Sequence, residues 1–314
     1  MNHGPLIFLA AFFALASSWC GFVLTPQLQI GRLQQTNTVG SATAAYPVAR
    51  SGLARQGLEV YRANGCACCH SQQVGQTGTA LEIGLTDAGT NQAVTLAALL
   101  KLAAPREDQE VVLTPMPALA AVRGNSNAPT LPAGRALLRS SSREAANAAV
   151  ATLNATGAKA QLWIVPVGPD IARGWGKRRT VAEDYLFDSP VMPGSQRVGP
   201  DLANVGARLP DANWHLLHFY APQLQVKGST MPPYRFLFEK RKVERRVSPD
   251  ALVLPAELTP APGYEVVPKP AAKALAAYLL SLRADAPLFN APLTMLAAAT
   301  PNATNAAPAG PATK

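Results

Sequence analysis

The stretch Cys66-Ala67-Cys68-Cys69-His70 decides how this chain is interpreted. It has the form C-x-x-C-H, with Cys68 in the second variable position, and this form is the pattern of covalent heme c attachment. Two thiols three residues apart on one helical turn can each bond a vinyl group of one porphyrin, and the adjacent histidine then points at the iron. The sequence therefore predicts one covalently attached heme c, bound through Cys66 and Cys69, with His70 as the proximal metal ligand.

Other uses of clustered cysteines fit less well. The chain has four cysteines, and three of them lie in this one stretch, which excludes a disulfide framework. A structural zinc site needs further Cys or His at ligand spacing, and the sequence has none there. The motif also follows Ser51–Asn64, whose apolar residues recur at helical spacing. We therefore expect an amphipathic helix that leads directly into the heme motif.

An electron-transfer heme needs a sixth ligand, and a methionine raises the reduction potential relative to a histidine. Met231 lies in the string STMPPY, where two prolines hold the backbone extended and rigid. Met192, in the string PVMPGS, has similar local chemistry and is the main rival. We favour Met231 as the distal ligand. The remaining candidates are Met116, His215 and His218.

The charge of the chain does not indicate a nucleic-acid partner. The formal net charge is +9, but no basic helix or basic strip with interleaved aromatic residues accompanies it. The densest basic run, Glu239–Arg246 (EKRKVERR), also contains two acids. This run is either a solvated loop or a docking surface for a partner.

The N-terminal segment is the candidate membrane anchor. Pro5–Leu24 is an uncharged apolar run of about 20 residues, which is enough for a helix to cross the hydrocarbon layer. A cleavable signal peptide is the competing interpretation, because Ala14–Ala16 could serve as a cleavage site. No Lys or Arg precedes the run, however, and the run continues past that site. We therefore favour a retained anchor, although the charges do not set its orientation.

Two further regions complete the expected organisation. Lys269–Arg283 has apolar residues at helical spacing, and we expect this helix to pack across the first one, with Gly57 allowing a close approach. Between the heme motif and residue 170 lies a long insertion without Cys or His, so we expect no second heme there. In it we expect strands over 80–85 and 158–167, helices over 91–103, 134–140 and 143–156, and a long loop over 105–132. Strands and helices in this order suggest a small α/β domain.

The strings around these features resemble class I c-type cytochromes, and more closely the mono-heme subunit II of cbb3-type cytochrome c oxidases, FixO or CcoO. The resemblance rests on GLEVY leading into NGCACCHSQQV, on GSQRVGPDLANVG at 194–206, and on WHLLH at 214–218 followed by the Met-Pro loop. It covers roughly residues 1–75 and 172–285. It implies a mainly α, class I cytochrome c fold with one N-terminal transmembrane helix and a small inserted α/β domain.

The expected domain boundaries follow from these regions. They are a transmembrane anchor 1–31, a tether 32–50, a cytochrome domain in two parts (51–78 and 171–283), an inserted domain 79–170 and a disordered tail 284–314.

The resemblance also implies roles for individual residues. Pro200 presents its backbone carbonyl to the free ring nitrogen of His70 and thereby orients that ligand. Arg197 lies near a heme propionate, in a charge-assisted pair; an ordinary surface arginine is the alternative. His218 contacts the propionate edge or a neighbouring subunit, whereas a structural role remains open for both His215 and His218.

The function implied is electron relay within a terminal oxidase. The heme accepts electrons from a donor cytochrome or a di-heme cytochrome subunit and passes them towards the heme-copper subunit that reduces oxygen. The resemblance places the chain in the inner membrane of a bacterium, with the heme domain on the periplasmic side. Because both axial positions are filled, we expect no catalytic site in this chain. The alternatives are the mono-heme subunit of a nitric oxide reductase, a free-standing anchored carrier, and a heme enzyme with an open iron.

Overall fold

In the computed structural model, residues 3–39, 45–104, 113–123 and 131–297 are described. The chain divides into two compact units. The first unit combines Met1–Thr77 with Gly168–Leu293, and the second combines Gly78–Val167 with Thr294–Lys314. The heme motif and both methionine loops therefore belong to the first unit.

The first unit is built mainly from short helices and one hairpin. Its described helices beyond the N-terminal segment are α3 (Gly52–Ala63), α7 (Pro169–Ala172), α8 (Val205–Arg208), α9 (Ala212–Tyr220), α10 (Pro222–Gln225) and α11 (Pro270–Ser281), with 3₁₀ turns at Cys66–Cys68, Ala182–Tyr185 and Arg235–Leu237. Its strands are β1 (Thr36–Asn37) paired with β2 (Ala45–Tyr46), and β7 (Phe238–Lys242) paired with β8 (Tyr264–Pro268). Both pairs are antiparallel.

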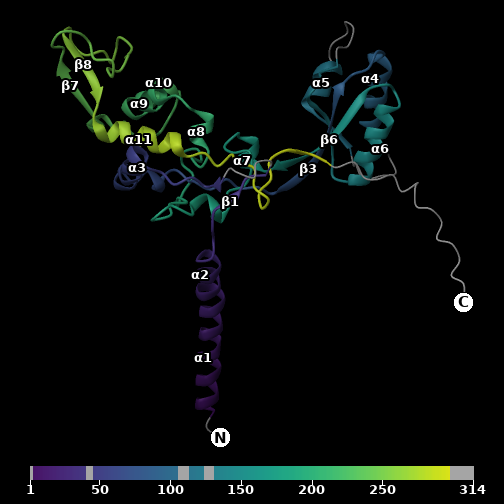
Figure 1. Ribbon diagram of the computed structural model, residues 1–314, viewed down its shortest axis with the longest axis horizontal. Coiled ribbons are helices and arrows are strands. Elements are labelled where there is room, and N and C mark those ends of the chain that lie inside the picture. The colour runs from purple at the N-terminus through teal and green to yellow at the C-terminus, as the bar shows by residue number, and fades with distance from the viewer. Residues whose placement is uncertain (1–2, 40–44, 105–112, 124–130, 298–314) are drawn as a thin grey trace, which may run out of the picture. The chain divides into compact units, whose positions relative to one another are not determined.

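The core of the first unit forms where α3 packs against α11, side by side in Figure 1. Tyr61 and Tyr278 are each 1% exposed, and their ring centroids are 5.2 Å apart. Gly57 makes this close approach of the two helices possible, because a Cβ added there would lie 1.9 Å from the carbonyl oxygen of Ala274. The predicted helices and their close approach at Gly57 are thus confirmed.

We expect the substitution Gly57→Ala to destabilise the first unit by about 2 kcal/mol or more, since overpacking forces the two helix backbones apart. Glycine in a helix normally costs stability relative to alanine, so the opposite sign would be expected for an exposed helical site. The measurement is urea denaturation of the full chain in detergent. Gly78→Ala is the control, because nothing lies within 4 Å of a Cβ added there. Equal stability of the two variants would show that the helices can separate without cost.

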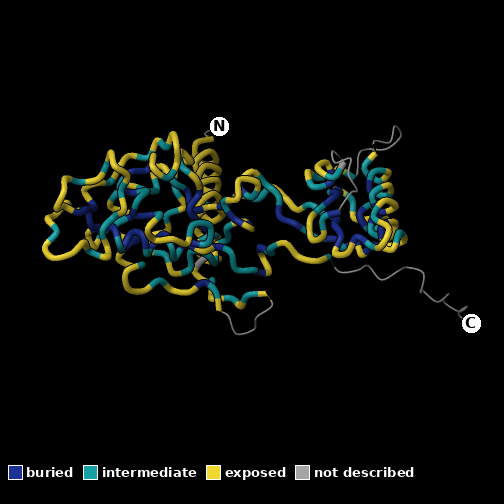
Figure 2. Tube along the Cα trace, turned by 90° about the horizontal axis from the view of Figure 1, so that it is seen from above, coloured by how far each residue is buried: buried dark blue, intermediate teal, exposed yellow. Residues whose placement is uncertain are grey.

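The N-terminal segment is one continuous helical rod. It consists of α1 (Gly4–Trp19), a π-helical turn (Cys20–Leu24) and α2 (Thr25–Ile30). Residues Gly4–Gln29 are long and apolar enough to cross a membrane, with a mean hydropathy of 2.1. Figure 2 shows this helix exposed along its length. These properties are compatible with the predicted membrane anchor and also with a signal segment.

The second unit is a five-stranded antiparallel sheet in the order β4-β5-β3-β6-β9. The strands are β3 (Gly78–Asp87), β4 (Leu113–Pro115), β5 (Ala136–Ser140), β6 (Lys159–Val167) and β9 (Met295–Leu296), and the described helices are α4 (Gln92–Leu102), α5 (Pro117–Arg123) and α6 (Arg143–Asn154). Side chains of the sheet and the helices form one core; Ile83, Leu99 and Leu153 are fully buried in it. Asn91 and Ser142 cap α4 and α6, which explains where these helices begin.

The prediction of a mainly α, class I cytochrome c fold is wrong. Of the described residues, 40% are helical and 16% lie in strands, and the largest sheet has five strands. One cause is the stretch 134–140, predicted as a helix, which contains β5. Leu137 and Leu138 are both fully buried there. A short apolar run of this kind cannot be assigned to helix or strand from its periodicity, and pairing with β3 decides it.

Two segments expected to be loose carry ordered contacts. Residues 32–50, expected as an exposed tether, contain β1 and β2, and the hydroxyl of Tyr46 donates a 2.6 Å hydrogen bond to Asp184. In the expected tail, Leu288 and Ala291 are buried in the first unit, and β9 pairs with β6 in the second. The rest of that tail, residues 298–314, lies outside the described residues.

Candidate heme site

The C-x-x-C-H motif forms a tight turn directly after α3. Gly65 reverses the chain in the left-handed conformation at φ +65°, which glycine adopts without strain. The 3₁₀ turn Cys66–Cys68 follows, and the backbone N–H of His70 donates to the carbonyl of Cys66 at 3.0 Å. The cysteines are free thiols. Burial raises the pKa of the half-buried Cys66 thiol to about 11, whereas Cys69 is exposed.

Among the described residues, one hydrogen bond orients the imidazole of His70. Its Nδ1 lies 2.8 Å from the carbonyl oxygen of Pro200, so this nitrogen donates and Nε2 is left for a ligand. The ring also needs the glycine at position 199, since a Cβ there would lie 2.3 Å from its Cε1 atom. Burial lowers the pKa of His70, which favours the neutral imidazole that a metal binds.

The chain around Pro200 runs along the motif and is held to it by backbone hydrogen bonds. Ser195 donates to Ala67, Gly199 donates to Cys69, and Leu202 donates to Ser71, at 3.1, 2.9 and 2.8 Å. In the other direction, Gln72 donates to Pro193 at 2.8 Å. Residues 67–72 and 193–202, about 130 residues apart in the sequence, are thus joined by backbone hydrogen bonds. This pairing sets the position of His70 relative to both thiols.

A buried carboxylate, Asp201, fixes the segment that follows the motif. Its side chain is fully buried and accepts three hydrogen bonds, from the hydroxyl of Ser71 at 2.6 Å and from the backbone N–H groups of Gln73 and Ala203 at 2.7 and 2.8 Å. Asp201 lies in the string GSQRVGPDLANVG, but no role was predicted for it from the sequence. The only available signal was that Asp201 is the single acid in this string.

Arg197 lies on a second buried carboxylate. Its Nη1 donates to both carboxylate oxygens of Asp170, at 2.8 and 2.7 Å, and its Nη2 donates to the carbonyl of Gln73. Asp170 is 2% exposed and accepts a further hydrogen bond from the backbone of Gly75 at 2.7 Å. Arg197 is therefore held beside the residues that follow the heme motif. Its predicted contact with a heme propionate stays a prediction.

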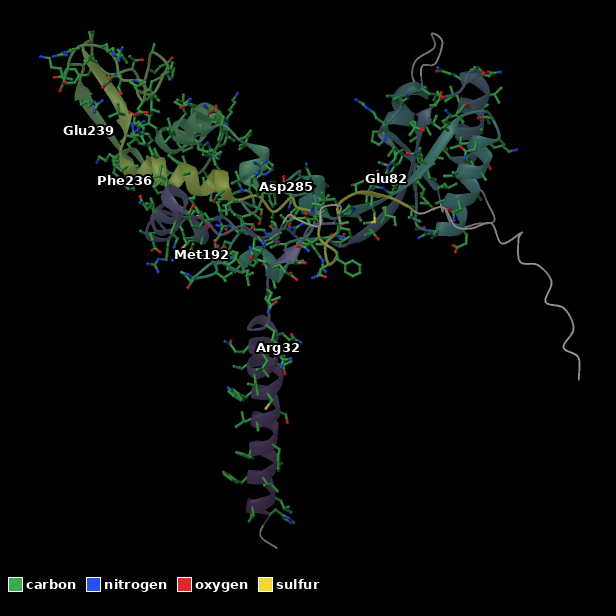
Figure 3. The ribbon with its side chains drawn as sticks, viewed as in Figure 1. Arg32, Glu82, Met192, Phe236, Glu239 and Asp285 are labelled. Carbon is green, nitrogen blue, oxygen red and sulfur yellow. The ribbon has the colours of Figure 1, made fainter. Side chains whose placement is uncertain are left out.

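Both candidate methionines lie at the same core. Met231 and Met192 are half-buried and pack against the core of the first unit, against which Cys66 also packs. The backbone of Met231 donates to the hydroxyl of Ser229 at 3.3 Å, and the loop closes where Tyr234 donates to the carbonyl of Phe219 at 2.7 Å. Figure 3 labels Met192. The two methionines remain alternatives on packing alone, whereas Met116 belongs to the second unit.

The two histidines of α9 differ in their partners. His215 is buried, and its Nε2 lies 2.9 Å from the carbonyl oxygen of Leu209, which accounts for it structurally. His218 stacks on Trp214, with ring centroids 4.8 Å apart and planes 9° from parallel. Its buried Nδ1 has no hydrogen-bond partner among the described residues. Burial, and then the nearby His215 and His70, lower the pKa of His218 to about 4.

The donor set fits a heme better than a bare metal ion. Two free thiols, an oriented imidazole with one available nitrogen and a thioether are the groups that a covalently attached, six-coordinate heme requires. Within the described ranges, no group of three His, Cys, Asp or Glu side chains could hold a metal ion by itself. The site therefore defines a candidate center for one electron-transfer heme.

Comparison with known families points in the same direction. Residues 160–260 match the family described as "Cytochrome C oxidase, mono-heme subunit/FixO". This match confirms the FixO-like identity predicted from the sequence and indicates a mono-heme subunit of a cytochrome c oxidase. It includes Arg197, Pro200 and Met231, but it begins at residue 160 and so does not include the C-x-x-C-H motif at residues 66–70. No curated protein matches the chain.

Proposed function

We propose that this chain carries one heme c, attached through Cys66 and Cys69 with His70 and Met231 as axial ligands. We further propose that it relays electrons as a membrane-anchored subunit of a cbb3-type terminal oxidase. The observation that carries the proposal is the 2.8 Å hydrogen bond from His70 Nδ1 to Pro200, beside two free thiols, in a FixO-like chain. This bond aims Nε2 away from Pro200 and fixes the tautomer that an iron ligand needs.

When bound, the heme supplies reversible one-electron exchange at its iron. The protein residues hold the ligands still, so that little reorganisation accompanies the exchange. The absence of a Cβ at Gly199 leaves space for the imidazole of His70. Asp201 accepts hydrogen bonds from Ser71 and Gln73 and so holds the segment directly after His70. If His70 and Met231 both bound the iron, no position would stay open for oxygen, and oxygen reduction would belong to a partner subunit.

The proposed surroundings follow from the family and from the apolar helix. Gly4–Gln29 is a retained anchor in the inner membrane of a bacterium, and the heme unit lies on the periplasmic side. Electrons arrive from a donor cytochrome or a di-heme cytochrome subunit and leave towards the heme-copper subunit. The FixO match favours this oxidase over a nitric oxide reductase.

Mass spectrometry of the purified chain tests the heme assignment. We expect one porphyrin linked to the peptide that contains Cys66 and Cys69. Cys66→Ser and Cys69→Ser should each lose one thioether bond and most of the covalently bound heme, because two linkages are needed for stable attachment. Cys68→Ser is the matched control and should retain both bonds, since Cys68 occupies a variable position of the motif. A chain without porphyrin at these residues would contradict the proposal.

The same preparation separates a subunit from a free-standing carrier. After extraction from native membranes in mild detergent, a subunit should co-purify with a heme-copper protein and a di-heme cytochrome. A single purified chain would support the carrier instead.

A further inference from the structure

The hairpin formed by β7 and β8, with the loop between them, stands on the core of the first unit. We call residues Phe238–Pro268 the basic hairpin. At its base, Phe238 and Val266 are buried in the same core against which Cys66 and Met231 pack. Beyond Phe238 every residue of β7 is exposed. The base of the hairpin therefore packs in the same hydrophobic core as the candidate heme site, whereas the rest of β7 is exposed to solvent.

The exposed part of the hairpin carries an excess of unpaired positive charge. Residues Glu239–Arg246, which cover most of β7 and the start of the loop after it, include five basic and two acidic residues. Arg241 is neutralised by Glu265 at 2.8 Å. Among the described residues, the other four cations make no ion pair: Lys240, Lys242, Arg245 and Arg246. The first unit as a whole has 20 Lys and Arg against 13 Asp and Glu, so most of the net charge lies in this unit.

The hairpin is braced rather than loose, so its charges keep a defined arrangement. Glu265 is 6% exposed and accepts hydrogen bonds from Arg241 and from the backbone N–H of Ser248, at 2.8 and 2.6 Å. The N–H of Ser248, and then Arg241, hold the pKa of Glu265 below its usual range, so this carboxylate stays charged at neutral pH. Leu252 also donates to the carbonyl of Val266 at 2.8 Å, which ties the loop to β8.

The chain connects this charged surface directly to the proposed distal ligand. Met231 is followed by the prolines, by Tyr234 and by the turn Arg235–Leu237, and β7 then begins at Phe238. Phe236 is 59% exposed between the methionine loop and the hairpin. Figure 3 labels Phe236 and Glu239 in this region. An exposed aromatic side chain bordered by cations is a typical composition for a protein interface.

We propose that the basic hairpin, with Phe236 at its edge, docks the acidic face of the soluble electron-transfer protein that reduces this chain. Charge complementarity steers such encounters and raises their rate. A protein partner fits better than an anionic lipid surface because the patch places Glu239 and Glu244 among its cations. An acidic protein face can offer a basic group opposite each of these two acids, whereas a uniformly negative lipid surface cannot. The inference rests on the proposed function, since it names the partner of the same heme.

The test reverses two of the unpaired charges, in the variant Lys240→Glu/Lys242→Glu. The probe is a reduced soluble cytochrome c with an acidic surface, mixed in stopped flow with the full chain in neutral phosphatidylcholine nanodiscs. We expect the second-order rate to fall about tenfold at low ionic strength and the difference to vanish at high salt. The control Lys101→Glu/Arg135→Glu changes the net charge equally on exposed residues of the second unit and should keep the rate.

Two further measurements make the outcome decisive. A soluble cytochrome c with a basic surface should react faster with the charge-reversed variant, not more slowly. Binding of the same nanodiscs to phosphatidylglycerol vesicles addresses the lipid alternative. If the reversal abolishes vesicle binding but leaves the rate with the acidic cytochrome unchanged, the docking proposal is overturned.

Failure of the heme proposal can be recognised separately. A chain without heme shows no electron transfer in any variant. In that case, surface plasmon resonance with the acidic cytochrome still decides the docking surface, because binding does not require the heme. Binding weakened by the reversal and not by the control supports the surface, and equal binding of all variants overturns it.

Discussion

The variant Met231→Leu is expected to lower the reduction potential of the bound heme by on the order of 100 mV. Leucine keeps an apolar side chain of similar volume against the core but removes the thioether sulfur, so the effect isolates ligation from packing. A methionine ligand raises the potential relative to other axial arrangements, and axial ligands set heme potentials over about 0.8 V. The measurement is a redox titration of the purified chain. The sulfur-to-iron absorption band in the far red of the oxidised protein should disappear as well.

The matched control for this prediction is Met192→Leu. Met192 is also half-buried and packs against the same core, so its loss disturbs packing to a similar degree. We expect Met192→Leu to keep the far-red band and to shift the potential by much less. If the band and the potential are lost in Met192→Leu and kept in Met231→Leu, the distal ligand is Met192. If neither variant loses the band, the sixth ligand is not one of these two methionines.

The parts of the fold that could be predicted are those encoded by local pattern. Apolar residues at helical spacing predict the helices α3 and α11. The close approach of these helices could be predicted because Gly57 has no Cβ to keep the backbones apart. The pattern fails where non-local pairing decides. The stretch that contains β5 becomes a strand because β3 and β4 offer hydrogen bonds on both sides. Strand β7 lies in a run with mixed charges that has no alternating apolar pattern.

The candidate site divides in the same way. The thiols and His70 are contained in five consecutive residues, and the resemblance to known subunits placed Pro200 beside His70, where the structure has it. The two carboxylates that hold the segment after the motif were missed. Asp201 and Asp170 lie 128 and 95 residues along the chain from Gln73 and Gly75, whose backbone N–H groups donate to them. A single sequence has no local signal for such a contact.

Replacement of Asp201 by alanine is expected to destabilise the first unit by about 3 kcal/mol. The change leaves three donors without an acceptor in a place with no solvent access, and each buried unpaired donor costs about 1–3 kcal/mol. The three contributions share one site and therefore do not add in full. The measurement is urea denaturation of the full chain in detergent, followed by tryptophan fluorescence.

The control is Asp211→Ala, which removes an exposed carboxylate that accepts one hydrogen bond from Asn213 at 2.9 Å at the start of α9. Loss of a helix cap of this kind costs about 1 kcal/mol. A second readout follows the site itself, because Asp201 holds Ser71 and Gln73 directly after His70. Asp201→Ala should therefore also reduce the heme content of the chain, whereas Asp211→Ala should not. Equal losses of stability in the two variants would mean that water reaches the donors and that the carboxylate does not hold the heme-binding turn in place.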